Sequence, residues 1–382
     1  MGKAVVIGGG VGGLTAGVAL RRRGWEVTVL ERASQIEPVG SGLAIAANAL
    51  KALDVLELGD RIRGLATAEG RLGLRRADGR WMVHTSEAEA DSKYGDSMVI
   101  TLRATLMEVL IDALGPGRLL LNSAVSEVDA GKGLVRTEAG ELEADLIVAA
   151  DGIHSATRRA LFPEHPGPVY SGVTAWRGLV PRDGLSVPRS ESWGRGTVFG
   201  IHLLAGDVVY LYATDVVPAG VTHADEREEL LRRFGGWHEP IPALLRAADP
   251  ADIIRNDIYY NAEPLPAFHR GRVALVGDAA HAMTPNLGQG ACQAIEDGVV
   301  LAHVAGRDLA EYSAARMERT AKIVRRSMTM CRMSKLRNPL AVRLRDFGLS
   351  AAARLSPDLM LRSMDEMLRW RPPVEPEGPA GR

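Results

Sequence analysis

A glycine-rich turn near the start of the chain, GGGVGG at residues 8–13, constrains the fold more than any other feature. It follows a continuous apolar run at residues 4–7, which is typical of a parallel strand buried on both faces. An expected helix over residues 14–23 comes next. This strand–turn–helix order predicts a Rossmann-like dinucleotide-binding unit.

The residue types inside the turn support that reading. Gly8 permits the tight turn, Gly10 lets the backbone approach a pyrophosphate, and Gly13 lets the helix pack closely on the strand. Val11 lies between them and is expected to contact the same ligand.

An acidic residue ends the second expected strand, which spans residues 26–30. Glu31 lies there, 18 residues after Gly13, where a carboxylate accepts hydrogen bonds from ribose hydroxyls. A carboxylate disfavours a 2′-phosphate, so NADP is not expected at this site, but FAD and NAD are not distinguished. Arg32 either contacts an adenine or is solvated.

A second glycine-rich segment at residues 277–290 resembles a further cofactor loop in its build. An apolar strand at 273–276 runs into Gly-Asp, a loop with Pro285 follows, and Gly290 opens a helix. Backbone N–H groups and a helix N-terminus then point to one place and stabilise negative charge. The candidate cofactor contacts of this segment are Asp278, Pro285, Gly288 and Gly290.

Three weaker signals lie between these two segments. Gly42 belongs to a second glycine-bearing turn. Arg103 precedes a helix expected from residue 104 and is either a surface residue or a phosphate contact. Asp151 begins an Asp-Gly pair after a strand expected over residues 142–150, and such a pair is commonly only a turn.

The character of the sequence changes after residue 168. Short alternating runs, separated by proline and glycine, replace the βα rhythm and predict antiparallel strands. They span residues 173–180, 197–203, 208–213 and 253–260. We expect a sheet inserted between the halves of the nucleotide domain to serve as the substrate platform.

Composition excludes several classes of function. The net charge of -1 argues against a nucleic-acid partner. Cys292 and Cys331, the two cysteines of the chain, form no CxxC pair and no metal-ligand spacing, so no metal site is expected and a reducing, cytoplasmic location fits. No run of about 18 apolar residues occurs, so no transmembrane segment is expected.

The order and spacing of GGGVGG with Glu31, of Asp151-Gly152 and of Gly277-Asp278 resemble the single-component, class A FAD-dependent monooxygenases. Residues 170–178 and 312–326 resemble the salicylate-hydroxylase branch, which is related to 4-hydroxybenzoate hydroxylase. The resemblance implies that Gly8, Gly10 and Gly13 hold the FAD pyrophosphate and Glu31 the ribose. It further implies FAD contacts for Arg103, Asp151 and Asp278, with residues 285–290 beside the isoalloxazine ring.

The resemblance also implies the reaction. Such an enzyme uses NADH or NADPH and O2 to hydroxylate or epoxidise an aromatic or polyunsaturated small molecule through a flavin C4a-hydroperoxide. The implied fold is α/β: an FAD-binding domain (1–75, 98–166 and 266–335), an antiparallel-sheet substrate domain (76–97 and 167–265), and a C-terminal helical segment and tail (336–382). A monomer or a homodimer is expected.

Residues for catalysis are less clearly indicated. Pro285 lies in the loop beside the ring, and His202 and Tyr212 either activate a phenol or are structural. Arg177 pairs either with a substrate carboxylate or with a core acid. An FAD-dependent dehydrogenase or reductase and a non-catalytic flavin-binding protein remain alternatives. The partial halogenase signature at residues 236–242 lacks its second tryptophan, and that activity is disfavoured.

A basic run over residues 316–345 contains ten Arg or Lys and one acid, Glu318. It either forms a solvated helix face, the favoured reading, or attracts phosphates or an anionic surface.

Overall fold

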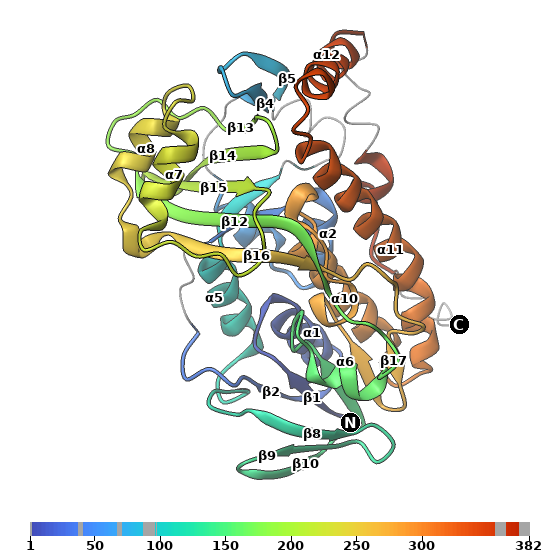
Figure 1. Cartoon of the computed structure of the whole chain (residues 1–382). Coiled ribbons are helices and arrows are strands. Elements are labelled where there is room, and N and C mark those ends of the chain that lie inside the picture. The colour runs from blue at the N-terminus through green and yellow to red at the C-terminus, as the bar shows by residue number, and fades with distance from the viewer. Residues whose placement is uncertain are drawn as a thin grey trace, which may run out of the picture.

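Two large β-sheets, with smaller sheets and helices around them, make up the fold, as a computed structural model shows (Figure 1). The structure describes residues 2–36, 41–66, 71–86, 96, 98–355 and 364–373. Most of the stretch 87–97 and the tail expected beyond residue 373 lie outside these described residues.

The first sheet is the predicted nucleotide-binding sheet. In spatial order its strands are β17 (His269–Arg270), β18 (Val273–Leu275), β11 (Leu146–Ala149), β1 (Lys3–Ile7), β2 (Glu26–Leu30) and β7 (Leu119–Leu120). All neighbours are parallel except the pair of β17 and β18. Because parallel strands end at the same edge, the segments after β18, β11, β1 and β2 meet there, although the sequence separates them widely.

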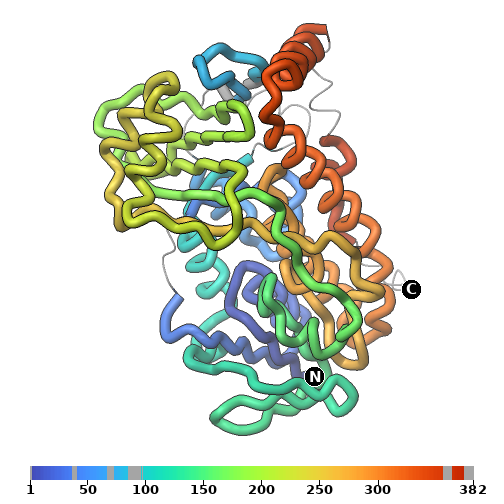
Figure 2. The backbone as a smooth tube through the Cα atoms, in the orientation of Figure 1, coloured from blue at the N-terminus to red at the C-terminus, as the bar shows by residue number. Residues whose placement is uncertain are grey.

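Helices cover this sheet and bury its apolar strands. They are α1 (Val11–Arg22), α2 (Ala47–Val55), α3 (Gly59–Arg63), α5 (Arg103–Leu114), α6 (Ala156–Leu161), α9 (Asp278–His281), α10 (Gly290–Val304) and α11 (Leu309–Ser334), with the 3-10 turn η2 (Pro285–Leu287). Figure 2 shows the N-terminal unit beside the segment that holds α10. Gly298 lets α10 pack closely against α1, because a Cβ on Gly298 would lie 2.8 Å from the backbone nitrogen of Ala16.

The second sheet is the predicted substrate platform. In spatial order its strands are β16 (Ile254–Tyr260), β12 (Val169–Pro181), β15 (Val208–Asp215), β14 (Thr197–Leu204), β13 (Ser190–Trp193), β4 (Arg71–Arg76) and β5 (Trp81–Ser86).

The four antiparallel strands expected after residue 168 are confirmed. Strand β4 also pairs here, so the domain boundary expected after residue 75 cuts through a strand of this sheet.

The two faces of the second sheet have different neighbours. Trp176, Phe199 and Ile201 point to the outer face, where α7 (Glu226–Phe234), α8 (Ile241–Ala247) and the turn η1 (Pro250–Asp252) lie. His202 and Tyr212 point to the inner face, as alternation along a strand requires. Gly200 makes room for the Tyr212 ring, because any Cβ at that position would overlap it.

One predicted strand is wrong. The run at residues 142–150 forms two strands, β10 (Gly140–Glu143) and β11, in different sheets. Asp145 separates them, because its backbone N–H donates to the carbonyl of Lys3 and its carboxylate accepts the N–H of Lys3. β10 pairs instead with β9 (Leu134–Thr137), which pairs with β8 (Val125–Asp129).

The C-terminal part combines one integrated and one projecting segment. Residues 364–370 return to the nucleotide domain, where Met367 and Leu368 are buried. Helix α12 (Pro339–Leu355) instead lies at the top of the view in Figure 1, beside β5. Among the described residues, no helix combines the length and apolarity needed to cross a membrane.

Candidate functional site

The glycine-rich turn after β1 is shaped by close backbone contacts. Gly8 has φ of 105°, and a Cβ on it would overlap the carbonyl oxygen of Ala150. A Cβ on Gly13 would overlap the carbonyl oxygen of Gly8. These two positions therefore require glycine, which leaves the first N–H groups of α1 open to an anionic ligand.

The acid at the end of β2 supports the same turn. Glu31 Oε2 accepts a hydrogen bond from the N–H of Gly9 at 2.7 Å, and Oε1 accepts one from the N–H of Ala33 at 2.9 Å. Each carboxylate oxygen keeps a second lone pair for a ribose hydroxyl. The predicted ribose role and the observed turn-holding role are thus compatible.

A basic side chain lies over the glycine turn. Arg103 is the first residue of α5, one residue earlier than expected, and its N–H bonds to the carbonyl of Ser41 at 2.9 Å. Its Nη2 would lie 3.6 Å from a Cβ on Gly10. Arg103 is also close enough to Asp278 to lower the pKa of that carboxyl. The structure therefore brings Gly10, Arg103 and Asp278 to one place.

Asp278 combines solvent exposure with close protein surroundings. Its side chain is exposed to solvent, yet the protein atoms around it raise its pKa by desolvation, against the opposing charges of His281, Arg103 and Arg158. A carboxylate that solvent reaches while protein surrounds it is placed to contact a bound molecule rather than bulk water.

Arg158 joins two of the loops. Its buried guanidinium donates from Nη1 to the carbonyl of Ala279 at 3.1 Å and from Nη2 to the carbonyl of Ile153 at 2.7 Å. The second loop contains Asp151, whose Oδ2 accepts the N–H of Thr157 at 3.1 Å. Its Oδ1 is buried without a protein partner, which leaves a strong acceptor available to a ligand.

The 277–290 loop is anchored at its start by Asp297 of α10. This buried carboxylate accepts hydrogen bonds from the N–H of Gly277 at 2.8 Å, from His281 Nε2 at 2.6 Å and from Arg316 Nε at 2.6 Å. Burial acts to raise the pKa of Asp297, but His281 and Arg316 outweigh it and lower the pKa to about 2.

The loop is anchored at its end by the neighbouring carboxylate, Glu296. Glu296 Oε1 accepts the Asn48 amide at 2.6 Å and the Gln293 amide at 3.0 Å. Both amides also donate to Gln289 Oε1, each at 3.0 Å. Arg316 pairs with Glu296 Oε2 at 2.5 Å, so one guanidinium contacts both anchors, and Arg319 Nε also pairs with Glu296 Oε2 at 2.7 Å.

The middle of the loop has its own contacts. Ser327 of α11 donates its hydroxyl to the carbonyl of Thr284 at 2.6 Å, one residue before Pro285. The buried Cys292 thiol lies 3.3 Å from the carbonyl of Ala44 and 3.6 Å from that of Gly288. Burial raises the pKa of Cys292 to about 12, so this thiol packs and bonds but does not ionise.

Sequence reasoning missed this anchoring network, although a signal existed. Helix α10 is buried nearly all round, so the adjacent acids Glu296 and Asp297 required a buried cation. The expected solvated face for the basic run is wrong at Arg316, Arg319 and Arg345, which are buried or partly buried in ion pairs with carboxylates.

The inner face of the second sheet carries a carboxyl–phenol pair. Tyr212 donates its hydroxyl to Glu191 Oε2 at 2.5 Å, and the Trp193 indole N–H donates to Glu191 Oε1. Burial raises the pKa of Glu191 despite these bonds, and burial with the nearby Glu191 raises the pKa of Tyr212 well above its ordinary value. Both side chains remain partly accessible.

His202 stacks on this pair. Its ring lies 5.8 Å from the Tyr212 ring and 6.5 Å from the Tyr210 ring, nearly parallel to both. Burial, then the charge of Arg189, lowers the pKa of His202 to about 4, so the imidazole is neutral at pH 7. Its Nδ1 is buried without a partner.

The inner face meets the cofactor loops through Gly42. The Tyr210 ring lies against Gly42, where a Cβ would come within 2.5 Å of Tyr210 Cδ1. Gly42 belongs to β3 (Gly42–Ile45), which pairs with β6 (Val99–Leu102). Two residues further along β3, the Cβ of Ala44 would lie 3.2 Å from a Cβ built on Gly288. The aromatic face and the glycine loop are therefore neighbours across β3.

The remaining predicted residues fall at the border of this region. Pro285 exposes its ring at the start of η2. Arg177 of β12 lies opposite Tyr212 of the neighbouring strand β15. Its guanidinium donates to Asn256 Oδ1 at 3.0 Å, so the hydrogen-bond partner is an amide rather than a core acid. Arg32 follows Glu31 directly and is exposed to solvent.

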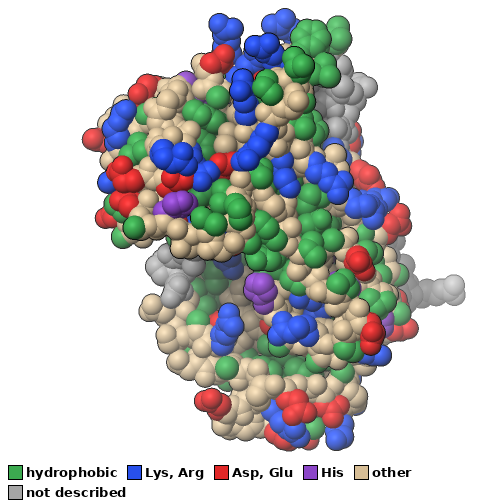
Figure 3. Space-filling model, viewed as in Figure 1, with side chains coloured by type: hydrophobic (Ala, Val, Ile, Leu, Met, Phe, Trp, Pro, Cys, Tyr) green, Lys and Arg blue, Asp and Glu red, His purple; other side chains and the backbone are tan. Residues whose placement is uncertain are grey.

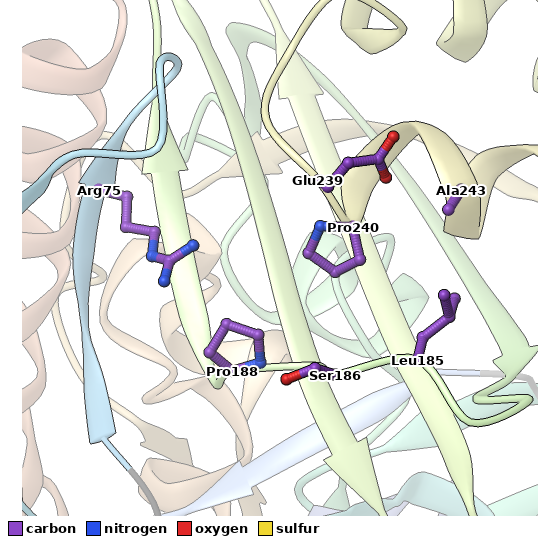
Figure 4. Close-up of a pocket in the computed structure, with 7 residues that line it drawn as sticks. All are labelled: Arg75, Leu185, Ser186, Pro188, Glu239, Pro240 and Ala243. Atoms are coloured by element: carbon purple, nitrogen blue, oxygen red, sulfur yellow. The ribbon is translucent and has the colours of Figure 1, made fainter.

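A separate surface depression lies away from these loops, with a volume of about 600 Å³ (Figure 4). It is lined by Arg75, Leu185, Ser186, Pro188, Glu239, Pro240 and Ala243. Two of these, Glu239 and Pro240, belong to the partial halogenase signature, which runs from the segment after α7 into the start of α8. None is a glycine-loop residue, so this depression is not the cofactor site.

The assembled residues fit FAD. Backbone without side chains at Gly8, Gly10 and Gly13 offers a pyrophosphate cradle at a helix N-terminus, with Arg103 beside it. The orphaned Asp151 Oδ1 and the accessible Asp278 supply acceptors for hydroxyl groups. The N-terminus of α10 faces the same region with unpaired N–H groups.

Comparison with known proteins agrees with this fit. The FAD binding domain family matches residues 2–195 and 254–327. The chain is 39% identical over 365 residues to the aurachin C monooxygenase/isomerase of Stigmatella aurantiaca, covering 90% of this chain and 92% of that protein. It is 34% identical over 345 residues to an FAD-dependent urate hydroxylase of Klebsiella pneumoniae, covering 86% and 89%.

A solved structure shows the same architecture. A substituted form of Klebsiella pneumoniae HpxO, complexed with FAD, superposes with a TM-score of 0.87 at 29% identity, covering 97% of this chain and 99% of that one.

Replacing Asp278 tests its predicted contact with FAD. Asp278→Ala removes charge-assisted hydrogen bonds, each worth about 1.5–3 kcal/mol, so the Kd for FAD should rise about tenfold or more. Fluorescence titration of the apoprotein measures it. Asp112→Ala, at an exposed ion pair with Arg61, is the matched control and should leave the Kd unchanged. Equal FAD affinity in both variants would remove Asp278 from the site.

Replacing Arg316 tests the anchor. Arg316→Met leaves two buried carboxylates short of a cation and should cost about 3–5 kcal/mol of unfolding free energy in urea denaturation. Arg307→Met, which breaks the exposed pair with Glu311, should cost about 0–1 kcal/mol. Similar losses in the two variants would contradict the anchoring role.

Acid should weaken the same anchor. Folding lowers the pKa of Asp297 from 3.8 to about 2, so its contribution to stability is complete above pH 4 and is lost as pH falls towards 2.

Proposed function

Because this chain belongs to the class A FAD-dependent monooxygenases, we propose that it oxygenates an aromatic compound that carries an ionisable ring O–H or N–H. The single observation that carries the substrate class is the Tyr212–Glu191 pair on the inner face of the second sheet. NADH or NADPH is proposed as the reductant and O2 as the oxygen source.

FAD, when bound, supplies the electron transfer and oxygen activation, which no side chain can perform alone. The protein holds it through the residues of the four strand ends. Gly8 to Gly13, Glu31 and Arg103 would hold the adenosine and pyrophosphate, and Asp151 and Asp278 the hydroxyl groups between them. Glycine at position 42 and the 285–290 segment would flank the ring.

The N-terminus of α10 contributes electrostatically. Its first N–H groups, from Gly290 onward, have no partner within the helix and favour nearby negative charge. The two-carboxylate anchor fixes the approach to this helix, so the amides are oriented before a ligand arrives.

The carboxyl–phenol pair provides a path for one proton. A substrate O–H or N–H donates to the Tyr212 hydroxyl oxygen while the Tyr212 proton passes to Glu191 Oε2. The substrate thereby loses one proton and Glu191 gains it. A deprotonated ring is richer in electrons and attacks an electrophilic oxygen more readily. Burial raises the pKa of Glu191, so this carboxylate holds a transferred proton more strongly than an ordinary carboxylate does.

The surrounding residues orient the substrate and exclude water. Neutral His202 extends the aromatic face formed with Tyr210 and Tyr212, and its free Nδ1 offers a further polar contact. Arg177, across the strand from Tyr212, offers a cation to an anionic ring substituent. Pro285 closes the flavin side of the space.

Two further proposals concern the location and the assembly of the protein. We propose a cytoplasmic location, supported by the two free, buried cysteines, Cys292 and Cys331. A monomer or homodimer is proposed, and light scattering decides between them.

The activity is tested by a substrate screen. Purified holoenzyme is offered phenols, indoles and prenylated aromatic compounds, and NADH or NADPH oxidation is followed while products are weighed by mass spectrometry. A substrate should accelerate the oxidation and gain the mass of one oxygen atom. Faster oxidation without any heavier product from any ionisable aromatic would contradict the proposed substrate class.

The proton path is tested by removing its hydroxyl. Tyr212→Phe and Glu191→Gln should each lower kcat about 10²–10⁴-fold, the usual contribution of general acid–base catalysis, and should remove the acidic limb of the pH profile, where protonated Glu191 accepts no further proton.

Tyr210→Phe is the matched control, because that phenol stacks on the same histidine but faces Arg177 rather than a carboxylate. If Tyr212→Phe raises KM alone and keeps the pH profile, the pair binds the substrate without moving a proton.

A further inference from the structure

Helix α12 presents large apolar side chains to solvent. Leu340, Leu344, Phe347 and Leu355 are 73%, 72%, 68% and 87% exposed. The next most exposed large apolar side chain among the described residues, Val55, is only 43% exposed. These four side chains are therefore a concentrated apolar surface rather than the scattered kind found on most proteins.

The four residues form one stripe. Their spacing of four, three and eight residues places them on one side of an α-helix, together with Ala351. The opposite side is packed: Val342 is buried, and Leu349 and Ala353 contact the apolar cluster around Trp193. Helix α12 is thus held on the protein while its apolar stripe faces outward.

The charge beside the stripe has one sign. Arg343 and Arg354 are exposed on its flank. The single acid of α12, Asp346, is buried and paired with Arg345 at 2.8 Å and Arg76 at 3.5 Å. Figure 3 shows basic and hydrophobic side chains gathered at the top of the molecule, where Figure 1 places α12.

We propose that α12 docks this protein onto the surface of an anionic lipid bilayer. An apolar stripe flanked by arginines, on a helix too polar to cross the membrane, is the combination that binds at a bilayer interface. The arginines meet lipid phosphates while the leucines and Phe347 enter the acyl boundary. Docking of a second copy through this stripe is less favourable, because it brings like charges together without an exposed acid on α12 to offset them.

The docked orientation has a consequence for the substrate. The cluster that receives the inner side of α12 also contacts Tyr212 and includes Met330 and Met333. A bilayer on the outer side of α12 would therefore lie beside the proposed substrate space and favour apolar substrates dissolved in lipid. This consequence rests on the proposed function, whereas docking itself does not.

Vesicle sedimentation of the full-length holoenzyme tests the docking. The protein should pellet with vesicles that contain phosphatidylglycerol, far less with pure phosphatidylcholine, and should be released by high salt. Leu344→Ser combined with Phe347→Ser should weaken binding about tenfold or more, because it removes the buried apolar area. Leu120→Ser, at a partly exposed leucine of β7, is the matched control and should bind as the parent does.

A second pair of substitutions separates charge from apolar contact. Arg343→Ala combined with Arg354→Ala should weaken binding to anionic vesicles about tenfold while leaving the flavin content unchanged. The proposal is overturned if the parent does not pellet with anionic vesicles, or if neither α12 pair reduces pelleting. The proposal is also overturned if the protein does not bind vesicles and light scattering instead finds a dimer that the Leu344→Ser and Phe347→Ser substitutions dissociate. The absorbance ratio of flavin to protein confirms folding and does not depend on substrate, so failure here is distinct from failure of the proposed reaction.

Discussion

The buried contact between Arg316 and the adjacent carboxylates Glu296 and Asp297 is the interaction on which the site depends. Placing ions in a protein interior costs several kcal/mol each unless charge and hydrogen bonds are matched. Here the carboxylates also accept bonds from Gly277 and, through two amides, hold Gln289. Ion pairing on α10 and α11 therefore defines both ends of the loop that carries Asp278 and Pro285.

The parallel sheet supplies the second constraint. Its strands bring four segments to one edge, and hydrogen bonds then fix their spacing. Arg158 joins the segment after β11 to the one after β18, and Glu31 holds the turn after β1. Because these contacts are internal to the protein, the site is organised before a cofactor binds, which is the condition for effective electrostatic stabilisation.

The second sheet, which we propose as the substrate side, lies against the cofactor loops. Its aromatic inner face touches β3 through Tyr210 and Gly42, and β3 touches the flavin loop through Ala44 and Gly288. Gly200 lets the Tyr212 ring lie across a neighbouring strand and reach Glu191. Small residues at contact points thus decide how closely the two sheets approach.

Local sequence patterns determined the elements and the chemistry of the strand ends. GGGVGG, Glu31 and Asp278 could be recognised because turn geometry restricts residue types over a few positions. Alternation along a strand likewise placed His202 on the face opposite Phe199, and Tyr212 on the same face as Tyr210. Tertiary structure alone decided that Arg316 pairs with Glu296 and Asp297, that Glu191 pairs with Tyr212, and that the described part of the chain leaves the stripe of α12 exposed. These depend on contacts between distant segments, whose distances are set by packing and leave little trace in local periodicity.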